Sequence, residues 1–191
     1  MSLKLNSPGG GSITLQEPTT ASDRVLNLPN VDGTVVTTGS SAVVSQTMMA
    51  SGVAGNGPAF SAYLGGSLSV SNATLTKYTA TVERFDTNSC YDAPNARFTP
   101  NVAGYYFISL QNWFSSGTGN TAGVLQKNGS SVVQEYDYMS GGTTSRASSL
   151  IYFNGTTDYI EAYVYQFTGG TISLDPNSIN AGFYGYMVRA A

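Results

Sequence analysis

The chain contains no histidine and only one cysteine, Cys90, among its 191 residues. Without histidine it lacks the usual general base at neutral pH and the commonest zinc ligand. Histidine-dependent catalytic triads and ordinary catalytic zinc sites are therefore excluded. A single cysteine cannot form a disulfide within the chain, so we expect packing or oligomerisation to stabilise the fold.

Charged residues are also scarce, at 10% of the chain against about 25% in an average soluble protein. The formal net charge of −3 provides no electrostatic footprint for nucleic acid. No apolar run approaches the roughly 18 residues that a membrane helix needs, and the first residues do not resemble a secretory signal. We therefore expect no nucleic-acid partner, no membrane insertion and synthesis without export.

The residues that remain are rich in small hydroxyls, glycine and tyrosine. Hydrophobic residues make up 41% of the chain, and there are 24 serines, 21 threonines, 22 glycines and 13 tyrosines. Threonine and tyrosine favour strands, whereas glycine and serine favour turns. The composition predicts a β-rich, turn-rich chain and excludes a charged helical bundle and a charged disordered tail.

The first 58 residues differ in texture from the rest. Three short apolar alternations, Ile13–Leu15, Val25–Leu28 and Val35–Val36, are each followed by a turn signal. Strands this short cannot enclose a core, so we expect them to pair with copies on other chains. The texture predicts three parts: a β-rich anchor or shaft over 1–39, a Gly/Ser-rich linker over 40–58 and a head domain over 59–191.

From residue 59 the strand signals become dense and regular, with turns between them and almost no helical periodicity. This pattern predicts an all-β, ten-stranded antiparallel jelly-roll sandwich. The ten predicted strands cover 59–64, 74–85, 97–99, 105–114, 123–126, 131–139, 145–153, 159–167, 171–174 and 181–188.

Residues 159–167 show how one strand divides its two faces. Ile160, Ala162 and Val164 alternate with tyrosines such as Tyr163 and Tyr165, so the aliphatic side chains should point between the sheets. The tyrosine face is then left outside, where a symmetric oligomer would cover it. The alternative is a half-wet sheet face, because tyrosine tolerates solvent at its hydroxyl end.

The middle of the chain carries a recognisable spacing of aromatic residues and glycine. Six residues separate Tyr91 from Phe98, and five separate Phe98 from Gly104, which begins a Gly-x-Tyr ending at Tyr106. This pattern, with 59–62, 125–129 and 183–186, resembles the globular head of complement component one, subcomponent q. That family shares a ten-strand jelly roll and tight homotrimers with the tumour necrosis factor superfamily.

The resemblance implies a homotrimer and a set of structural residues. Phe98, Tyr106 and Phe183 should fill the space between the sheets, and Gly104 should open a strand where the backbone is left-handed or tightly approached. With the tyrosines above, the residues assigned to core or trimer are Tyr91, Phe98, Gly104, Tyr106, Tyr163, Tyr165, Phe183 and Gly185.

The N-terminal part carries a second resemblance. Gly-Ser-Ile-Thr-Leu at 11–15, a proline turn, Leu28-Pro29 and Gly-Thr-Val-Val-Thr-Thr-Gly at 33–39 are similar to a recurring segment of bacteriophage, especially cyanophage, fibre and appendage proteins. The resemblance implies a virion component assembled in the bacterial host cytoplasm. Residues 1–39 would then contact other virion proteins.

The acidic residues offer two weak calcium candidates, Asp86 with Asp92 and Glu135 with Asp137, because calcium favours clustered carboxylates on loops. Solvated loop acids are the alternative interpretation. A carboxylate pair could also serve a glycosidase, but the sequence places no pair at the required separation. We expect no enzyme activity and, calcium aside, no cofactor.

Exposed aromatic residues are better candidates for binding. Trp113, Tyr136 and Tyr138, with Arg146 nearby in the sequence, could form a surface for sugar stacking or for a protein receptor. Core packing is the alternative for Trp113.

These observations favour a non-enzymatic, homotrimeric virion fibre or appendage. Its head would attach to a host-surface glycan or protein receptor through the avidity of several heads. Two alternatives remain open: a capsid or tail decoration protein without receptor specificity, and a bacterial carbohydrate-binding or cytokine-like ligand module.

Overall fold

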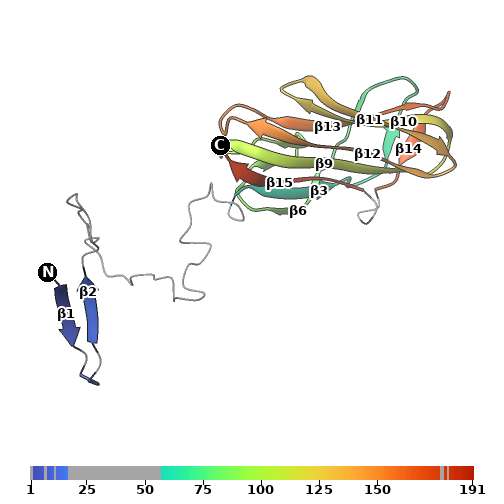
Figure 1. The fold of residues 1–191 in the computed structure, drawn as a ribbon. Helices are drawn as coiled ribbons and strands as arrows, with labels where there is room; N and C mark the ends of the chain where they lie inside the picture. The colour runs from blue at the N-terminus through green and yellow to red at the C-terminus, as the bar shows by residue number, and fades with distance from the viewer. Residues whose placement is uncertain (1, 7, 11, 17–56, 177–178, 180) are drawn as a thin grey trace. The chain divides into compact units, whose positions relative to one another are not determined.

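Strands make up all the regular secondary structure that this computed structural model describes (Figure 1). The described residues are 2–6, 8–10, 12–16, 57–176, 179 and 181–191. The chain divides into two units, Met1–Ser41 and Ala42–Ala191, and each is described by itself. Within the described ranges, no helix has the length and apolar character needed to cross a membrane.

The N-terminal unit contains one antiparallel strand pair. β1 (Ser2–Asn6) pairs with β2 (Ser12–Gln16), from Ser2 opposite Gln16 to Asn6 opposite Ser12. The strand predicted at Ile13–Leu15 is therefore present as β2, and its partner belongs to the same chain. The strands predicted at 25–28 and 35–36, and residues 40–56 of the predicted linker, lie outside the described residues.

The head contains two antiparallel sheets that face each other across a shared core (Figure 1). The seven-stranded sheet, called the β9 sheet below, comprises β3 (Ala59–Tyr63), β4 (Leu68–Val70), β6 (Val82–Asp86), β9 (Gly104–Phe114), β12 (Thr143–Phe153), β14 (Ile172–Leu174) and β15 (Gly182–Ala190). The six-stranded sheet, called the β13 sheet, comprises β5 (Thr76–Lys77), β7 (Tyr91–Asp92), β8 (Arg97–Phe98), β10 (Thr118–Lys127), β11 (Ser130–Ser140) and β13 (Ile160–Phe167).

β9 is the central strand of its sheet, between β12 and β15. Its even-numbered residues, including Tyr106, Ile108 and Leu110, are fully buried, so the odd-numbered residues point to the outer face of the sheet. β13 also buries its even-numbered residues, since Ile160 and Val164 are fully buried. The aliphatic face predicted for 159–167 thus lies against the core.

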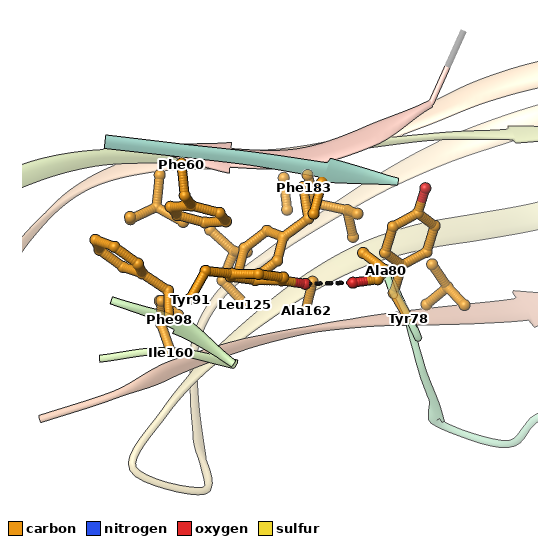
Figure 2. Packing of buried hydrophobic residues seen from close by; sticks show 14 of the residues in the cluster. Phe60, Tyr78, Ala80, Tyr91, Phe98, Leu125, Ile160, Ala162 and Phe183 are labelled. Carbon is orange, nitrogen blue, oxygen red and sulfur yellow. Dashed lines mark hydrogen bonds between the residues drawn. The ribbon is translucent and has the colours of Figure 1, made fainter. Parts of the chain in front are cut away.

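An aromatic cluster fills the space between the sheets (Figure 2). The ring of Phe60 stacks on Phe98 with centroids 4.3 Å apart and on Tyr91 at 4.9 Å, and it meets Phe183 edge-on at 4.9 Å. The Tyr91 hydroxyl donates a 2.6 Å hydrogen bond to the Ala80 carbonyl. Truncating a buried aromatic residue costs about 3–5 kcal/mol, so this cluster carries much of the stability of the head.

The predicted all-β antiparallel sandwich is confirmed, with differences in individual strands. The run predicted as one strand over 74–85 is divided between β5 in one sheet and β6 in the other. Tyr78 and Ala80 lie between these strands and are fully buried, because the chain crosses from sheet to sheet there. Alternation alone cannot show that a strand changes sheet. The strands β4 and β7 were not predicted.

Gly123 determines how closely the sheets approach at one edge. A Cβ atom placed on Gly123 would lie 2.6 Å from both the carbonyl carbon and the carbonyl oxygen of Arg146 in β12. The absence of a side chain therefore lets β12 lie directly against β10. This approach fixes the position of β12 relative to β10.

We predict that Gly123→Ala destabilises the head by about 1–3 kcal/mol, the usual cost of overpacking. Gly66→Ala is the matched control, since an added Cβ meets nothing within 4 Å there, and it should stay within about 0.5 kcal/mol of the wild type. Chemical denaturation measured by circular dichroism gives both values. Equal stabilities of the two variants would contradict the close approach at Gly123.

Candidate binding site

Except for Tyr163 and Tyr165, the predicted structural residues lie in the interior of the sandwich or at close strand contacts. Phe98, Tyr106 and Phe183 are fully buried, and the Tyr106 hydroxyl donates a 2.8 Å hydrogen bond to the Val102 carbonyl. A Cβ atom on Gly104 would meet the backbone of β15, and one on Gly185 would lie 2.8 Å from the Phe107 carbonyl. Both glycines thus allow close backbone approach within the β9 sheet.

Tyr163 and Tyr165 lie half-buried on the outer face of the β13 sheet. The Tyr165 ring packs edge-on against Phe167, with centroids 4.6 Å apart. The Tyr163 hydroxyl donates a 2.9 Å hydrogen bond to Glu161. Burial is the larger cause, and this hydrogen bond the second, that raises the pKa of Tyr163 to about 12. Their role at an oligomer contact stays a prediction.

Glu161 is a buried carboxylate with several hydrogen-bond donors. Its Oε1 accepts hydrogen bonds from Lys77 Nζ and Arg97 Nε, both at 2.8 Å, and its Oε2 accepts the bond from Tyr163. Burial by itself raises the pKa of Glu161, but the hydrogen bonds from Lys77, Arg97 and Tyr163 outweigh it, so the pKa is lowered. This cluster joins β5, β8 and β13, and the Glu161 carboxylate is fully bonded within it.

Asp86 and Asp92 hold local turns. Asp86 accepts hydrogen bonds from the backbone amides of Asn88 and Tyr91, at 3.3 and 2.8 Å. Asp92 accepts bonds from the Asn95 side chain at 2.6 Å and its backbone at 3.1 Å, and these lower its pKa. Across the described part of the chain, no group of three or more His, Cys, Asp or Glu side chains could hold a metal ion.

The second acidic pair and most of the predicted receptor residues meet in one place. An open groove of about 590 Å³ lies where β9, β11 and β12 meet beside the turn that joins β11 to β12. This β11–β12 groove is lined by Trp113, Glu135, Tyr136, Asp137, Gly142, Thr143, Thr144 and Arg146. Its volume is in the range of small-ligand sites.

The aromatic side of the groove comes from β9. Trp113 is an odd-numbered residue of β9, so its indole lies on the outer face of the β9 sheet beside Thr144, its register partner in β12. Gly142 packs against the ring, since a Cβ atom there would be 2.7 Å from the Trp113 Cζ2 atom. The turn and the sheet thereby hold the partly exposed indole in place.

The polar side of the groove comes from β11 and β12. Glu135 Oε1 accepts a 2.9 Å hydrogen bond from the Ser148 amide, which lies on the edge of β12 that does not pair with β9. The Asp137 carboxylate and the Arg146 guanidinium are exposed, and neither forms an ion pair with another described residue. The groove therefore offers one acceptor group and one donor group of opposite charge.

Tyr138 lies apart from the groove lining, although it belongs to β11 and is 68% exposed. Conversely, Gly142, Thr143 and Thr144 line the groove and were not predicted to do so. The run Gly-Gly-Thr-Thr that contains them signals a turn. Because β11 and β12 belong to different sheets, the turn between them crosses from one sheet to the other, and this crossing brings it against Trp113.

A second cavity, of about 350 Å³, lies on the outer face of the β9 sheet near Arg84 and Tyr184. The Arg84 guanidinium donates hydrogen bonds to Ser61 Oγ at 3.2 Å and to the Ala181 carbonyl at 3.3 Å, and it lies over the Tyr63 ring. Its charge already serves to join β3, β6 and the start of β15, so we assign it a structural role.

The outer face of the β9 sheet also carries a band of apolar side chains. In the sheet register, Tyr152 lies opposite Tyr105, and Phe107 lies between Leu150 and Tyr186. Ring centroids are 5.5 Å apart for Tyr105 and Tyr152, and 5.8 Å for Phe107 and Tyr186. We call this band the aromatic face; its residues are Tyr105, Phe107, Leu150, Tyr152, Tyr186 and Val188.

Comparisons with known proteins agree with this architecture. Murine APRIL at pH 5.0 superposes with a TM-score of 0.53 at 11% identity, over 68% of this chain and 98% of that one. The globular domain of the zebrafish complement 1qA protein superposes with a TM-score of 0.50 at 15% identity, over 70% of this chain and 99% of that one. The head has the complement-one-q and tumour-necrosis-factor-like jelly-roll fold. No family model and no curated protein matches the sequence.

We predict a pH-dependent contribution of Glu161 to stability. Because its pKa is lowered in the folded state, the contribution is complete above the unfolded pKa of about 4.3 and is lost as the pH falls through the lower folded value. Glu161→Gln should lower the free energy of unfolding by about 1–3 kcal/mol at pH 7, and by progressively less below pH about 4.3. Denaturation curves from pH 7 to 3 measure the difference, and a constant difference would contradict the assignment.

Proposed function

We propose that this chain is a homotrimeric, non-enzymatic attachment protein of a bacteriophage particle. Its head would project outward and bind the host surface, while residues 1–39 would join it to other virion proteins. The observation that carries the proposal is the aromatic face, an exposed apolar band on a head with few charges. Such bands mark surfaces that bind another protein.

The aromatic face supports self-association. Tyr105, Leu150, Tyr152, Tyr186 and Val188 are each 41–57% exposed in the single chain. Aromatic residues are enriched and charges are depleted at interface cores. Three strands contribute neighbouring residues to the band, so a partner can bury it as one unit. The trimeric state is supported by the resemblance to families that form tight homotrimers.

Two further observations support the attachment role. The segment over 11–39 resembles bacteriophage fibre and appendage proteins, which points to a virion. The absence of histidine, together with the bonded carboxylates of Asp86, Asp92 and Glu161, favours binding over catalysis. Three heads on one fibre would multiply a weak contact through avidity.

Leu150→Asp tests the self-association surface. Leu150 is 57% exposed, so the folded monomer should tolerate the aspartate, whereas a trimer contact would bury three unpaired carboxylates. We expect light scattering to give the mass of three 20.0 kDa chains for the wild type and of one chain for Leu150→Asp. Circular dichroism and thermal melting should show that the variant is folded.

Phe167→Asp is the matched control for the other sheet. Phe167 is 43% exposed on the outer face of the β13 sheet, next to the tyrosines whose oligomer role the sequence predicts. We expect this variant to remain trimeric. Dissociation of Phe167→Asp with an intact Leu150→Asp trimer would place the contact on the β13 sheet, and a monomeric wild type would reject self-association.

Immunogold labelling tests the virion role. We expect an antibody raised against residues 57–191 to label the parent particle at a defined position on head or tail. Labelled particles that still adsorb to host cells after the antibody blocks every head would favour a decoration protein. Unlabelled particles, with the protein free in the lysate, would favour a bacterial ligand module.

A further inference from the structure

The β11–β12 groove gathers polar groups that the fold itself does not use. In the described residues, neither Asp137 nor Arg146 makes a side-chain hydrogen bond or salt bridge, and the Trp113 indole N–H donates to no protein acceptor. By contrast, the charged side chains of Glu161, Lys77 and Arg97 are satisfied within the fold. The unused groups are those available to a ligand.

Trp113 provides a rigid platform. Its indole is partly exposed on the outer face of the β9 sheet, and the turn at Gly142 packs against its six-membered ring. Side chains held in this way lose little conformational entropy when a ligand binds. A partly exposed aromatic surface favours a flat apolar partner such as the C–H face of a sugar ring.

The charges of the groove disfavour an acidic saccharide. Glu135 and Asp137 are negative and Arg146 is positive, so a strongly anionic chain would meet net repulsion. A carboxylate accepts several hydrogen bonds and a guanidinium donates several in a planar array. The neighbouring hydroxyl groups of a sugar both donate and accept hydrogen bonds, so they can bond to the Asp137 carboxylate and to the Arg146 guanidinium.

We propose that the β11–β12 groove binds a neutral oligosaccharide, with a sugar ring stacked on Trp113 and its hydroxyls bonded to Asp137 and Arg146. Thr143 and Thr144 add hydroxyl groups along the same wall of the groove. This inference rests on the proposed attachment function and names the class of receptor that it uses. A saccharide repeat on a cell surface offers many equivalent sites, which suits weak binding by several heads.

The groove and the aromatic face occupy different stretches of the same sheet face. Trp113 lies six residues from Phe107 on β9, about 20 Å along the strand, and Arg146 lies four residues from Leu150 on β12, about 13 Å. Self-association and saccharide binding therefore depend on different residues. Each can be removed by substitution without removing the other.

Trp113 also provides the measurement, because it is the one tryptophan in the sequence. Purified trimer is first applied to an array that pairs neutral oligosaccharides with sialylated or uronic-acid counterparts and includes bacterial surface saccharides. The strongest neutral binder is then titrated while tryptophan emission is recorded. We expect saturable binding and a shift in emission, with at least about tenfold weaker binding of the acidic counterpart.

Arg146→Ala and Asp137→Asn should each weaken that binding at least about tenfold, the expected loss of hydrogen bonds to a charged group. Glu83→Gln removes an exposed carboxylate outside the groove and should bind like the wild type. Light scattering must show that every variant remains trimeric. Two results would place the site elsewhere and overturn the inference. One is binding on the array without a change in tryptophan emission, and the other is an affinity that neither groove substitution changes.

Periodate oxidation of host cells separates the saccharide inference from the attachment function. If the inference is right, oxidation of surface saccharides abolishes adsorption of the labelled trimer, and protease treatment leaves it intact. Adsorption that survives periodate but not protease would keep the attachment function and overturn the saccharide in favour of a protein receptor. Failure to adsorb to untreated host cells, with no neutral glycan bound on the array, would reject both.

Discussion

Contact between Phe60 of β3, Phe183 of β15, Tyr91 of β7 and Phe98 of β8 holds the two sheets together. The lone cysteine is buried and unbridged, so apolar burial must supply the stability that disulfides provide in many small β domains. Each of these strands alternates its side chains between the two faces of its sheet. Once the aromatic rings take their places in the core, the residues between them must lie outside.

The surface of the head follows from this constraint along β9. With Tyr106, Ile108 and Leu110 buried, Tyr105 and Trp113 must point outward at the two ends of the strand. One end joins the aromatic face, and the other forms a wall of the β11–β12 groove. A single strand therefore carries residues of both the proposed contact between copies and the proposed contact with a receptor.

Some of these features were predictable from local patterns. Alternation over 159–167 correctly predicted the buried aliphatic side chains, and the aromatic character of Trp113 marked it as a binding candidate. The aromatic face was not predicted, because Tyr105, Tyr106 and Phe107 are consecutive and a strand apolar on both faces shows no alternation. The grouping of Trp113 with Glu135 and Asp137 was also missed, because it arises where two sheets meet.

The sequence by itself determined the fold class and the absence of histidine chemistry, and it marked individual residues as candidates for binding. These are local properties, since strand periodicity, turn residues and side-chain chemistry are encoded within a few neighbouring positions. Only the tertiary structure decided that the chain changes sheet after Tyr78, that Gly123 lets β12 approach β10, and that the turn at Gly142 packs against Trp113. These contacts join residues distant in the chain, so their geometry exists only after the sheets have packed.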